Sequence, residues 1–138
     1  MIRAVLHPGV LIAGLISPSG VPASIIRAWQ QGIFELVVSE KLLDELTATL
    51  LRPKFRRWVD GDDAVTFVEV LRLAAMVVDD PADVERVSRG PNDDYLVALA
   101  SAAHASVLVS GDRDLTSIER SDPPIVSPRR FLEPLGSR

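Results

Sequence analysis

The sequence predicts an α/β fold, a three-layer α/β/α sandwich with a central parallel sheet. Short, almost wholly apolar segments alternate along the chain with longer segments in which apolar residues recur at helical spacing. The short segments lack the polar alternation of a half-exposed strand, as is typical of parallel strands covered on both faces. This alternation predicts βαβ units. A chain of 138 residues with no repeat predicts a single domain over residues 1–138.

Five segments are expected to form strands. Each is short and dominated by apolar, often β-branched residues. They span residues 2–6, 34–38, 76–78, 106–109 and 125–126. Pro123 and Pro124 precede the last segment and limit it to a short edge strand.

Helices are expected between these strands. They comprise a short helical turn over residues 10–16, helices over 22–31, from Ser39 to Pro53, over 64–75 and from Asn92 to His104, and a terminal turn over 127–132. His7-Pro8-Gly9 predicts a turn, because proline removes a hydrogen-bond donor and glycine accepts unusual dihedral angles. Residues 79–90 are polar and are predicted to form a mobile loop, and residues 115–118 to form a connection.

The apolar stripes predict which helix faces are buried. The expected inward residues are Leu42, Leu43, Leu46, Leu50 and Leu51 in one helix, Val65, Val68, Leu71 and Leu73 in the next, and Leu96, Val97 and Ala100 in the third. Ser39 is expected to cap the first of these helices, and Asn92 or Asp93 the last. Glu45 lies beside its stripe, where burial is costly unless the carboxylate is paired or metal-bound.

Composition excludes several classes of function. The chain has no cysteine, which excludes disulfides and thiolate metal sites, and its formal net charge is −4. Nucleic acid must therefore be held by a local basic patch and by metal ions. The apolar N-terminus faintly resembles a secretory signal, but its interruption by His7-Pro8-Gly9 favours a buried strand and a turn. No segment reaches the roughly 18 apolar residues of a membrane span, so we expect a soluble, cytoplasmic protein.

Two acidic residues flank a helix and the buried strand that follows it. Asp94 lies in the first turn of the helix after Asn92, and Asp112 follows the strand over residues 106–109. In a parallel α/β unit, the carboxyl end of a strand and the start of a neighbouring helix can border one crevice. We expect the two acids to face each other across a pocket that attracts a cation. Taken singly, each is better explained as a cap or turn residue.

Three acidic residues, in their local contexts, carry a resemblance to a known family. They are Glu45 in SEKLLDELTATLLRPKF, Asp94 in PNDDYLVALA and Asp112 in VLVSGDRDL. These segments resemble the PIN-domain family, and in particular bacterial PIN proteins that act as toxins of toxin–antitoxin pairs. The resemblance extends from residue 2 to about residue 131.

The resemblance implies a PIN-like sandwich, a metal-dependent endoribonuclease that acts on RNA, an antitoxin partner and a homodimer. It implies that Glu45, Asp94 and Asp112 are catalytic, metal-binding acids with Ser110 as a polar partner. Such acids hold Mg²⁺ or Mn²⁺, which lowers the pKa of a bound water and stabilises charge on the scissile phosphate.

The chain departs from the family at its first motif. The family has Asp-Thr-Asn after the first strand, where this chain has His7-Pro8-Gly9. Exchanging a carboxylate for a neutral imidazole removes a negative charge from a Mg²⁺ site, whereas histidine still suits Mn²⁺ or another transition metal. His7 is thus either a ligand of a retuned site or, slightly favoured, a hydrogen-bonded structural residue.

The remaining polar residues have structural alternatives. Asp93 is expected to be the helix cap, Asp114 a fourth acid or a solvated turn residue, and His104 a surface residue. Arg52, Lys54 and Arg56 form a basic run interleaved with aromatic residues, which suits an RNA backbone and a stacked base. A solvated turn anchored by Phe55 and Trp58 is the favoured interpretation of this run.

Three functions remain open at this point. The first is a PIN-type ribonuclease toxin. The second is a catalytically degenerate PIN-like module that binds RNA or a protein partner, which the His7-Pro8-Gly9 segment favours. A third is a phosphoacceptor domain, which needs a lysine after a strand, whereas Lys41 and Lys54 do not follow strands.

Overall fold

A computed structural model of the chain describes residues 1–85, 93–118 and 121–136. Its centre is a parallel sheet with the strand order β3-β2-β1-β4-β5 in the described residues. The strands are β1 (Arg3–Leu6), β2 (Glu35–Val38), β3 (Met76–Val77), β4 (Val107–Val109) and β5 (Ile125–Val126). All five predicted strands are confirmed, and β5 lies at an edge as expected.

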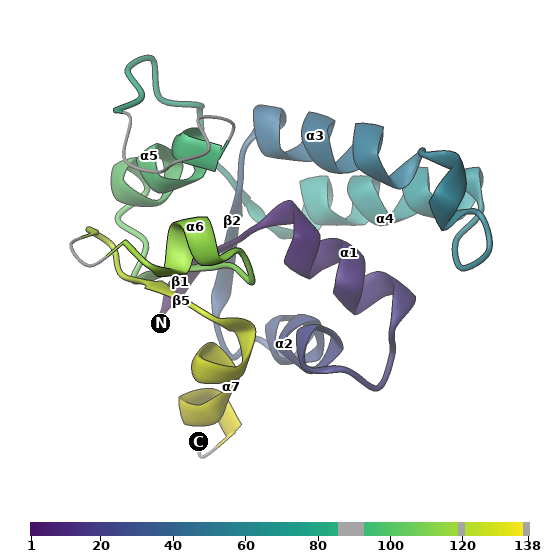
Figure 1. The fold of residues 1–138 in the computed structure, drawn as a ribbon, viewed down its shortest axis with the longest axis horizontal. Coiled ribbons are helices and arrows are strands. Elements are labelled where there is room, and N and C mark those ends of the chain that lie inside the picture. Colours follow the sequence, from purple (N-terminus) through teal and green to yellow (C-terminus); the bar gives the residue numbers. More distant parts are fainter. Residues whose placement is uncertain (86–92, 119–120, 137–138) are drawn as a thin grey trace.

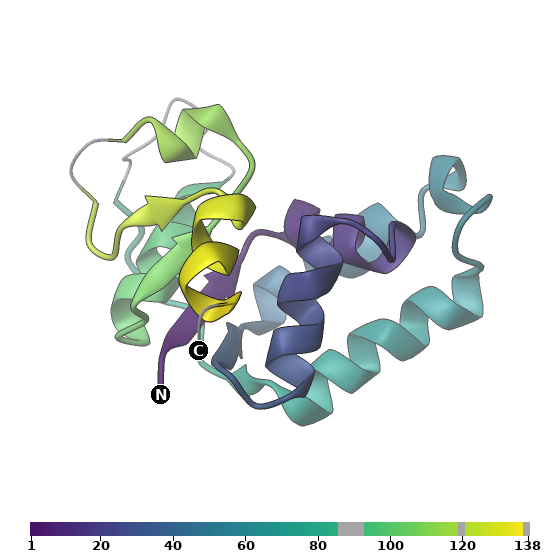
Figure 2. The same cartoon turned by 90° about the horizontal axis from the view of Figure 1, so that it is seen from below.

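Helices cover both faces of this sheet. They are α1 (Pro8–Ile16), α2 (Val21–Gln30), α3 (Glu40–Leu50), α4 (Gly61–Ala74), α5 (Asp94–Ala102), α6 (Arg113–Thr116) and α7 (Pro128–Gly136), with a 3₁₀ turn η1 (Pro53–Phe55). Figures 1 and 2 show α1 to α4 gathered on one side of the sheet and α5 and α6 on the other. The three-layer α/β/α sandwich is confirmed.

The segment after β1 differs from the prediction. His7-Pro8-Gly9 was expected to be a turn, but helix α1 already begins at Pro8. Proline suits the first helical position because its missing N–H has no partner there in any case. His7 is the N-cap, and its Nδ1 accepts a hydrogen bond from the Gly9 N–H at 2.9 Å. An imidazole thus does what a serine or aspartate side chain does at most helix starts.

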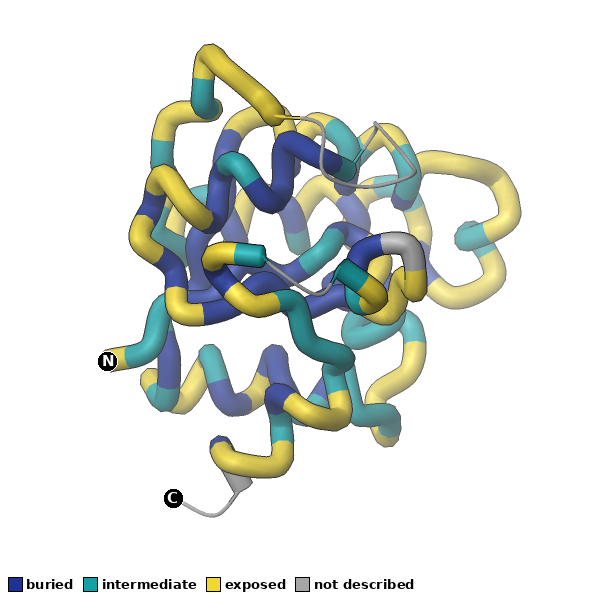
Figure 3. Tube along the Cα trace, turned by 60° about the vertical axis from the view of Figure 1, so that its left-hand side comes forward, coloured by how far each residue is buried: buried dark blue, intermediate teal, exposed yellow. Residues whose placement is uncertain are grey.

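Burial follows the predicted stripes with three exceptions. Figure 3 shows the buried positions concentrated along the central strands and on the inner faces of the helices. Leu42, Leu43, Leu46 and Leu50 are fully buried, but Leu51 is 46% exposed because it follows the last residue of α3. Helix α4 buries Ala64, Val68 and Leu71, and leaves Val65 and Leu73 exposed. The prediction that Leu51, Val65 and Leu73 are inward was therefore wrong.

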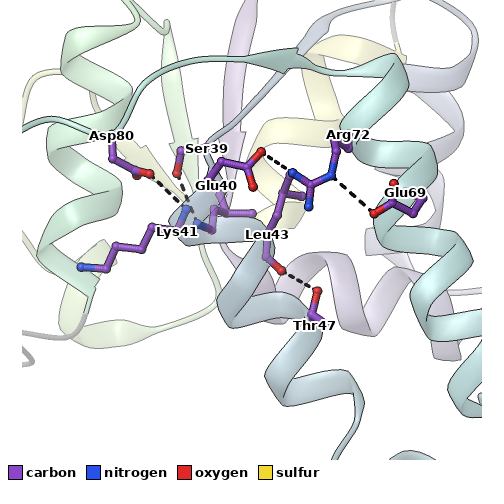
Figure 4. Close-up of polar contacts among 9 residues, drawn as sticks. Ser39, Glu40, Lys41, Leu43, Thr47, Glu69, Arg72 and Asp80 are labelled. Atoms are coloured by element: carbon purple, nitrogen blue, oxygen red, sulfur yellow. Dashed lines mark hydrogen bonds and ion pairs between the residues drawn. The ribbon is translucent and has the colours of Figure 1, made fainter.

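The start of α3 shows how local chemistry fixes a helix after its strand. Ser39 is the N-cap as predicted, and its Oγ accepts from the Leu42 N–H at 3.2 Å. The Asp80 carboxylate, from the segment after β3, accepts from the Lys41 N–H at 3.0 Å (Figure 4). Arg72 of α4 contacts both Glu40 and Glu69, which ties α4 to the first turn of α3.

The remaining predictions concern connections and termini. Residues 115–118 were expected to form a connection, but residues 113–116 form the short helix α6, and the terminal turn is the longer helix α7. Residues 79–85 contain no helix or strand; Asn92 and residues 86–90 of the predicted mobile loop lie outside the described part. Among the described residues no single helix is long and apolar enough to cross a membrane. Helices α1 and α2 have that length and composition only when taken together, and the chain bends by 96° between them.

Candidate functional site

The candidate site lies where the strand order reverses. From β1 the chain proceeds outward to β2 and β3, and it then returns to place β4 on the other side of β1. Leu6 pairs with Val109, so His7 and Ser110 are the first residues beyond two adjacent strands. Ligands of open α/β sheets bind in the crevice at such a reversal, outside the carboxyl ends of the strands. The fold therefore brings His7 and Ser110 to the expected position of a site.

Buried polar side chains mark the same edge of the sheet. In the described part of the chain they are Ser39, Asp94 and Ser110, each at most 3% exposed. Ser39 follows β2, Ser110 follows β4, and Asp94 opens α5, which packs against β1 and β4. Burial of polar groups is costly unless they are hydrogen-bonded or otherwise paired. Their concentration at one edge indicates a polar site rather than a uniform core.

Both ring nitrogens of His7 have partners. Nδ1 accepts the Gly9 N–H, and Nε2 lies 3.2 Å from Oδ2 of Asp93. Since Nδ1 is the acceptor, the hydrogen of the neutral ring lies on Nε2 and is donated to the Asp93 carboxylate. The side chains of His7 and Asp93 are each about one-fifth exposed, at 22% and 21%. His7 therefore links the end of β1 to the start of α5.

Asp93 was predicted to cap α5 and Asp94 to be the site residue, and the structure changes the first of these roles. Asp93 does occupy the N-cap position of α5, but its side chain forms no capping hydrogen bond and instead contacts His7. Asp94 is the first residue of α5 and is 3% exposed. A carboxylate in the first helical turn is favoured by the positive end of the helix dipole. Asp93 thus occupies the predicted cap position, but its side chain does not form the capping hydrogen bond that we expected.

Glu45 is held by a residue that the sequence did not single out. The Tyr95 hydroxyl donates a hydrogen bond to Oε2 of Glu45, which is half-buried on α3. Burial, and next the Glu45 carboxylate, raise the pKa of Tyr95 above its ordinary value of 10.0, with Asp93 and Asp80 adding to the effect. The Lys41 ammonium lies 4.5 Å from the centre of the Tyr95 ring and supplies a cation–π contact. Tyr95 is thus the point where α3 and α5 meet.

Asp112 lies on the other side of the strand reversal. Its N–H donates to the buried Ser110 Oγ at 3.0 Å, and its carbonyl accepts from the N–H groups of Leu115 and Thr116, the last two residues of α6. The Asp112 residue is exposed. It borders a hollow of about 400 Å³ that His7 and Gly9 also line. The side chain of Asp114 lies outside the described part.

The predicted metal ligands are not gathered into one group within the described residues. Among the described side chains, no group of three or more histidine, aspartate or glutamate residues is placed to hold one metal ion. The carboxylate oxygens of Glu45, Asp94 and Asp112 suit Mg²⁺ or Mn²⁺ chemically. Glu45 accepts a hydrogen bond from Tyr95 on one oxygen, and His7 has a partner on each ring nitrogen. Binding of Mg²⁺ or Mn²⁺ by the three acids stays a prediction.

The basic run of the sequence lies at the distal end of α3. Arg52 and Lys54 are exposed, whereas Arg56 donates to the carbonyl of Leu50 and thereby satisfies the end of the helix. Arg57 stacks on Trp58, with 5.0 Å between the guanidinium carbon and the ring centre. Phe55 packs against the core, whereas Trp58 is 53% exposed, so one of the two aromatic residues expected to anchor the turn does so. Binding of RNA by Arg52, Lys54 and Arg56 stays a prediction.

The residues missed by sequence reasoning have only weak local signatures. Tyr95 directly follows Asp94, and Lys41 directly follows the first residue of α3. Neither a tyrosine nor a lysine at these positions indicates that α3 and α5 are in contact. Glu45 and Tyr95, which join the two helices, are 50 residues apart in the sequence. The sequence offers one indication for Tyr95: a tyrosine in an apolar helix normally has a hydrogen-bond partner for its hydroxyl.

The chain is similar to known proteins in sequence and in structure. A curated uncharacterised protein, MJ1680 of Methanocaldococcus jannaschii, is 25% identical over 117 residues, which is 85% of this chain and 75% of that protein. The crystal structure of PAE2754 from Pyrobaculum aerophilum is similar, with a TM-score of 0.65 and 16% identity over 100% of this chain and 91% of that one.

A second structure is VapBC2 from Rickettsia felis bound to a DNA fragment from its promoter, with a TM-score of 0.62 and 13% identity. The likeness covers 91% of this chain and 97% of that one. At these identities both structures show a shared fold. The model of the PIN domain matches residues 3–114, which is most of the chain. The chain therefore belongs to the PIN-domain family.

Proposed function

We propose that the protein is a PIN module of toxin–antitoxin type that binds single-stranded RNA and has lost the metal-dependent cleavage of its family. PIN domains are generally nucleases. The observation that carries the proposal is the double engagement of His7, whose two ring nitrogens bind Gly9 and Asp93. A divalent ion at this position would have to break one of these hydrogen bonds and would find one carboxylate fewer than the family provides.

Glycine at position 9 supports the same proposal. A Cβ atom added to Gly9 would lie 3.1 Å from Nδ1 of His7, closer than an ordinary contact. A side chain at position 9 would thus require the His7 ring to move by a few tenths of an ångström. His7 and Gly9 form a matched pair, which differs at both positions from the Asp-Thr-Asn motif that the family resemblance leads one to expect.

The first experiment measures RNA binding and cleavage by the full chain. Binding of a labelled, unstructured RNA is expected in the presence of EDTA, and no cleavage is expected after Mg²⁺ or Mn²⁺ is added. Absence of RNA binding would contradict the proposal. Cleavage that requires metal and disappears in both Asp94→Asn and Asp112→Asn would instead establish the alternative described below.

The second experiment measures the effect of Mn²⁺ on the melting temperature. The natural chain is expected to show no shift, whereas His7→Asp combined with Gly9→Asn should acquire one, because a ligand that binds only the folded state stabilises it. His104→Asp is the matched control, since it makes the same substitution at an exposed histidine. A clear shift in the natural chain would contradict the loss of the metal site.

The alternative is a metal-dependent endoribonuclease toxin that uses Glu45, Asp94 and Asp112 with Mg²⁺ or Mn²⁺. The position of Asp94 supports it, because a carboxylate that is 3% exposed opens α5 at the strand reversal. In this alternative the acids would hold the ion, and the ion would activate water for attack on the phosphodiester. The cleavage assay above decides between the two functions.

Two protein partners belong to the proposal. An antitoxin is supported by the similarity of the fold to VapBC2. A homodimer is supported by exposed apolar side chains on α4, where Leu73 is 85% and Val70 is 47% exposed. Light scattering should give twice the chain mass of 15.0 kDa, and Leu73→Glu should return it to the single-chain value. A monomeric natural chain would remove the homodimer.

A further inference from the structure

Helices α3 and α4 form a hairpin that projects away from the sheet, with the turn η1 at its far end (Figures 1 and 2). Five of the eight large apolar residues that are exposed in the described part of the chain lie between residues 51 and 73. They are Leu51, Trp58, Val65, Val70 and Leu73, with exposed fractions from 46% to 85%. Apolar residues exposed singly are normal, so it is their concentration on one hairpin that indicates an interaction surface.

A hollow of about 350 Å³ lies between the two helices of this hairpin. Ala48 of α3 and Val65 of α4 contribute apolar lining. At the end near the sheet, Arg72 contacts both Glu40 and Glu69 and joins α4 to the first turn of α3 (Figure 4). The hollow is therefore apolar along its length and charged where the helices meet the sheet.

One side of α3 changes its character along the helix. Glu40, Asp44, Ala48 and Leu51 are all exposed. They follow one another at intervals of three or four residues and therefore lie on the same side. The stripe begins with two acids near the sheet and ends with two apolar residues, and Arg52 follows directly. Along the hairpin this side is thus acidic, then apolar, then basic.

The end of the hairpin near the sheet carries excess negative charge. Glu40 and Glu69 share one cation, Arg72. Asp44 is exposed and forms no ion pair within the described residues. Leu73, which is 85% exposed, follows Arg72 in the last turn of α4. This end is complementary to a basic segment that also presents an apolar side chain.

The tip of the same hairpin, residues 52–58, has these properties. Arg52, Lys54 and Arg57 are exposed and form no ion pair within the described residues. Trp58 is 53% exposed and lies beside the Arg57 guanidinium. The aspartates at positions 60, 62 and 63 belong to the start of α4, where the helix dipole favours negative charge, and Asp60 caps that helix. The tip therefore complements the end near the sheet.

We propose that a second copy of the chain covers this hollow, with the two hairpins antiparallel and the basic tip of each on the acidic end of the other. The proposal rests on the homodimer proposed above and names its surface. A stripe that is acidic, apolar and basic in order matches its own reverse, as a twofold interface requires. A parallel arrangement would place like charges together, which is costly. The occupant is the same chain because both halves of the match are present on it.

Charge reversal tests the match between the two ends. The tip variant combines Arg52→Glu with Lys54→Glu, and the sheet-end variant combines Asp44→Lys with Glu69→Lys. Each variant alone places like charges at both ends of the dimer and should raise its dissociation constant by about tenfold or more in sedimentation velocity. An equimolar mixture of the two should dimerise like the natural chain, because the mixed dimer has opposite charges at both ends.

Two matched variants separate this effect from net charge. Arg129→Glu with Arg130→Glu on α7 has the same net charge as the tip variant. Asp83→Lys with Glu85→Lys after β3 has the same net charge as the sheet-end variant, and all four residues are exposed. Both controls should dimerise like the natural chain. An equal loss in each variant and its control would show an effect of net charge alone and would overturn the proposal.

Single cysteines test the antiparallel direction, since the chain has no cysteine of its own. Lys54→Cys mixed with Asp44→Cys should give a disulfide-linked pair after mild oxidation in air, whereas either variant alone should not. Ready cross-linking of Lys54→Cys with itself would place the two tips together and would overturn the proposal. Melting curves verify that each variant is folded.

Failure of this surface differs from failure of the homodimer. If the natural chain dimerises and both charge variants dimerise equally well, the surface is wrong and the homodimer stands. If the natural chain is monomeric, the homodimer and this surface are both contradicted, and the hollow is left to a different protein. RNA binding is measured separately and is decided by neither result.

Discussion

Helices α3 and α5 both begin at the carboxyl edge of the sheet, but the polar side chains at their starts have different partners. At α3, Ser39 and Asp80 accept hydrogen bonds from the N–H groups of Leu42 and Lys41, so these two side chains cap the helix, while Glu40 of the first turn contacts Arg72 of α4 (Figure 4). At α5, Asp93 occupies the cap position but contacts His7 of another element. The difference separates a helix start whose cap side chain binds the helix's own N–H groups from one whose cap side chain binds another element.

The largest expected effect tests whether the two ends are equally well packed. Leu42 and Leu96 are the third residues of α3 and α5, and both are fully buried. Leu42→Ala and Leu96→Ala should each lower the free energy of unfolding by roughly 2–5 kcal/mol, measured by denaturant titration. Ser101→Ala, at an exposed position of α5, is the control and should change it by no more than about 0.5 kcal/mol. A small effect at Leu96 alone would mean that α5 is loosely packed.

The second prediction concerns alkaline pH and sharpens the contrast at α5. Burial and Glu45 raise the pKa of Tyr95, so the unfolded chain loses this proton near pH 10 while the folded chain retains it. Stability is therefore unaffected below about pH 10 and falls above it, by at most about 1.4 kcal/mol for each pH unit. Tyr95→Phe should remove this part of the slope in denaturant titrations between pH 9 and 11. An unchanged slope would show that Tyr95 ionises normally in the folded protein.

The third prediction removes the cap that serves α3. Ser39→Ala deletes the acceptor of the Leu42 N–H and should lower the free energy of unfolding by about 1 kcal/mol. Ser39→Thr keeps the hydroxyl acceptor without adding a charge to this buried position and should retain more of the stability than Ser39→Ala. If the two variants were equally unstable, burial of the serine rather than its hydrogen bond would be responsible.

The smallest expected effect concerns the hydrogen bond between His7, after β1, and Asp93, at the start of α5. A double-mutant cycle with His7→Ala and Asp93→Ala should give a coupling energy of roughly 0.5–1.5 kcal/mol, the usual net value of one hydrogen bond. The corresponding cycle between Ser39→Ala and Asp93→Ala should be additive, because no hydrogen bond joins these residues in the described structure. Zero coupling between His7 and Asp93 would remove the link between β1 and α5.

The elements of the fold were predictable because each has a local cause. Apolar segments without alternation give the parallel strands, and Ser39 and Pro53 bound a helix with side chains that act on their own backbone. The buried face of α4 was not predictable in the same way. Apolar residues lie on both sides of this helix, so periodicity alone does not distinguish the buried Val68 from the exposed Leu73.

The candidate site was predictable in its position but not in its contacts. Acids at the start of a helix and after a strand indicate a sheet edge, and Asp94 and Asp112 were identified in this way. The contact between His7 and Asp93 joins residues that are 86 positions apart, and it depends on how α5 is placed against β1. No local pattern contains that information, and the same is true of the contact between Glu45 and Tyr95.

The close approach of Gly9 to the His7 ring has a consequence for how this sequence can change over generations. A side chain introduced at position 9 meets Nδ1 while the histidine is present, and it forces the ring to shift. Replacing the histidine first deprives Asp93 of the hydrogen that Nε2 donates. Either substitution made alone therefore disturbs one contact of the ring, so positions 7 and 9 are coupled and are best exchanged together.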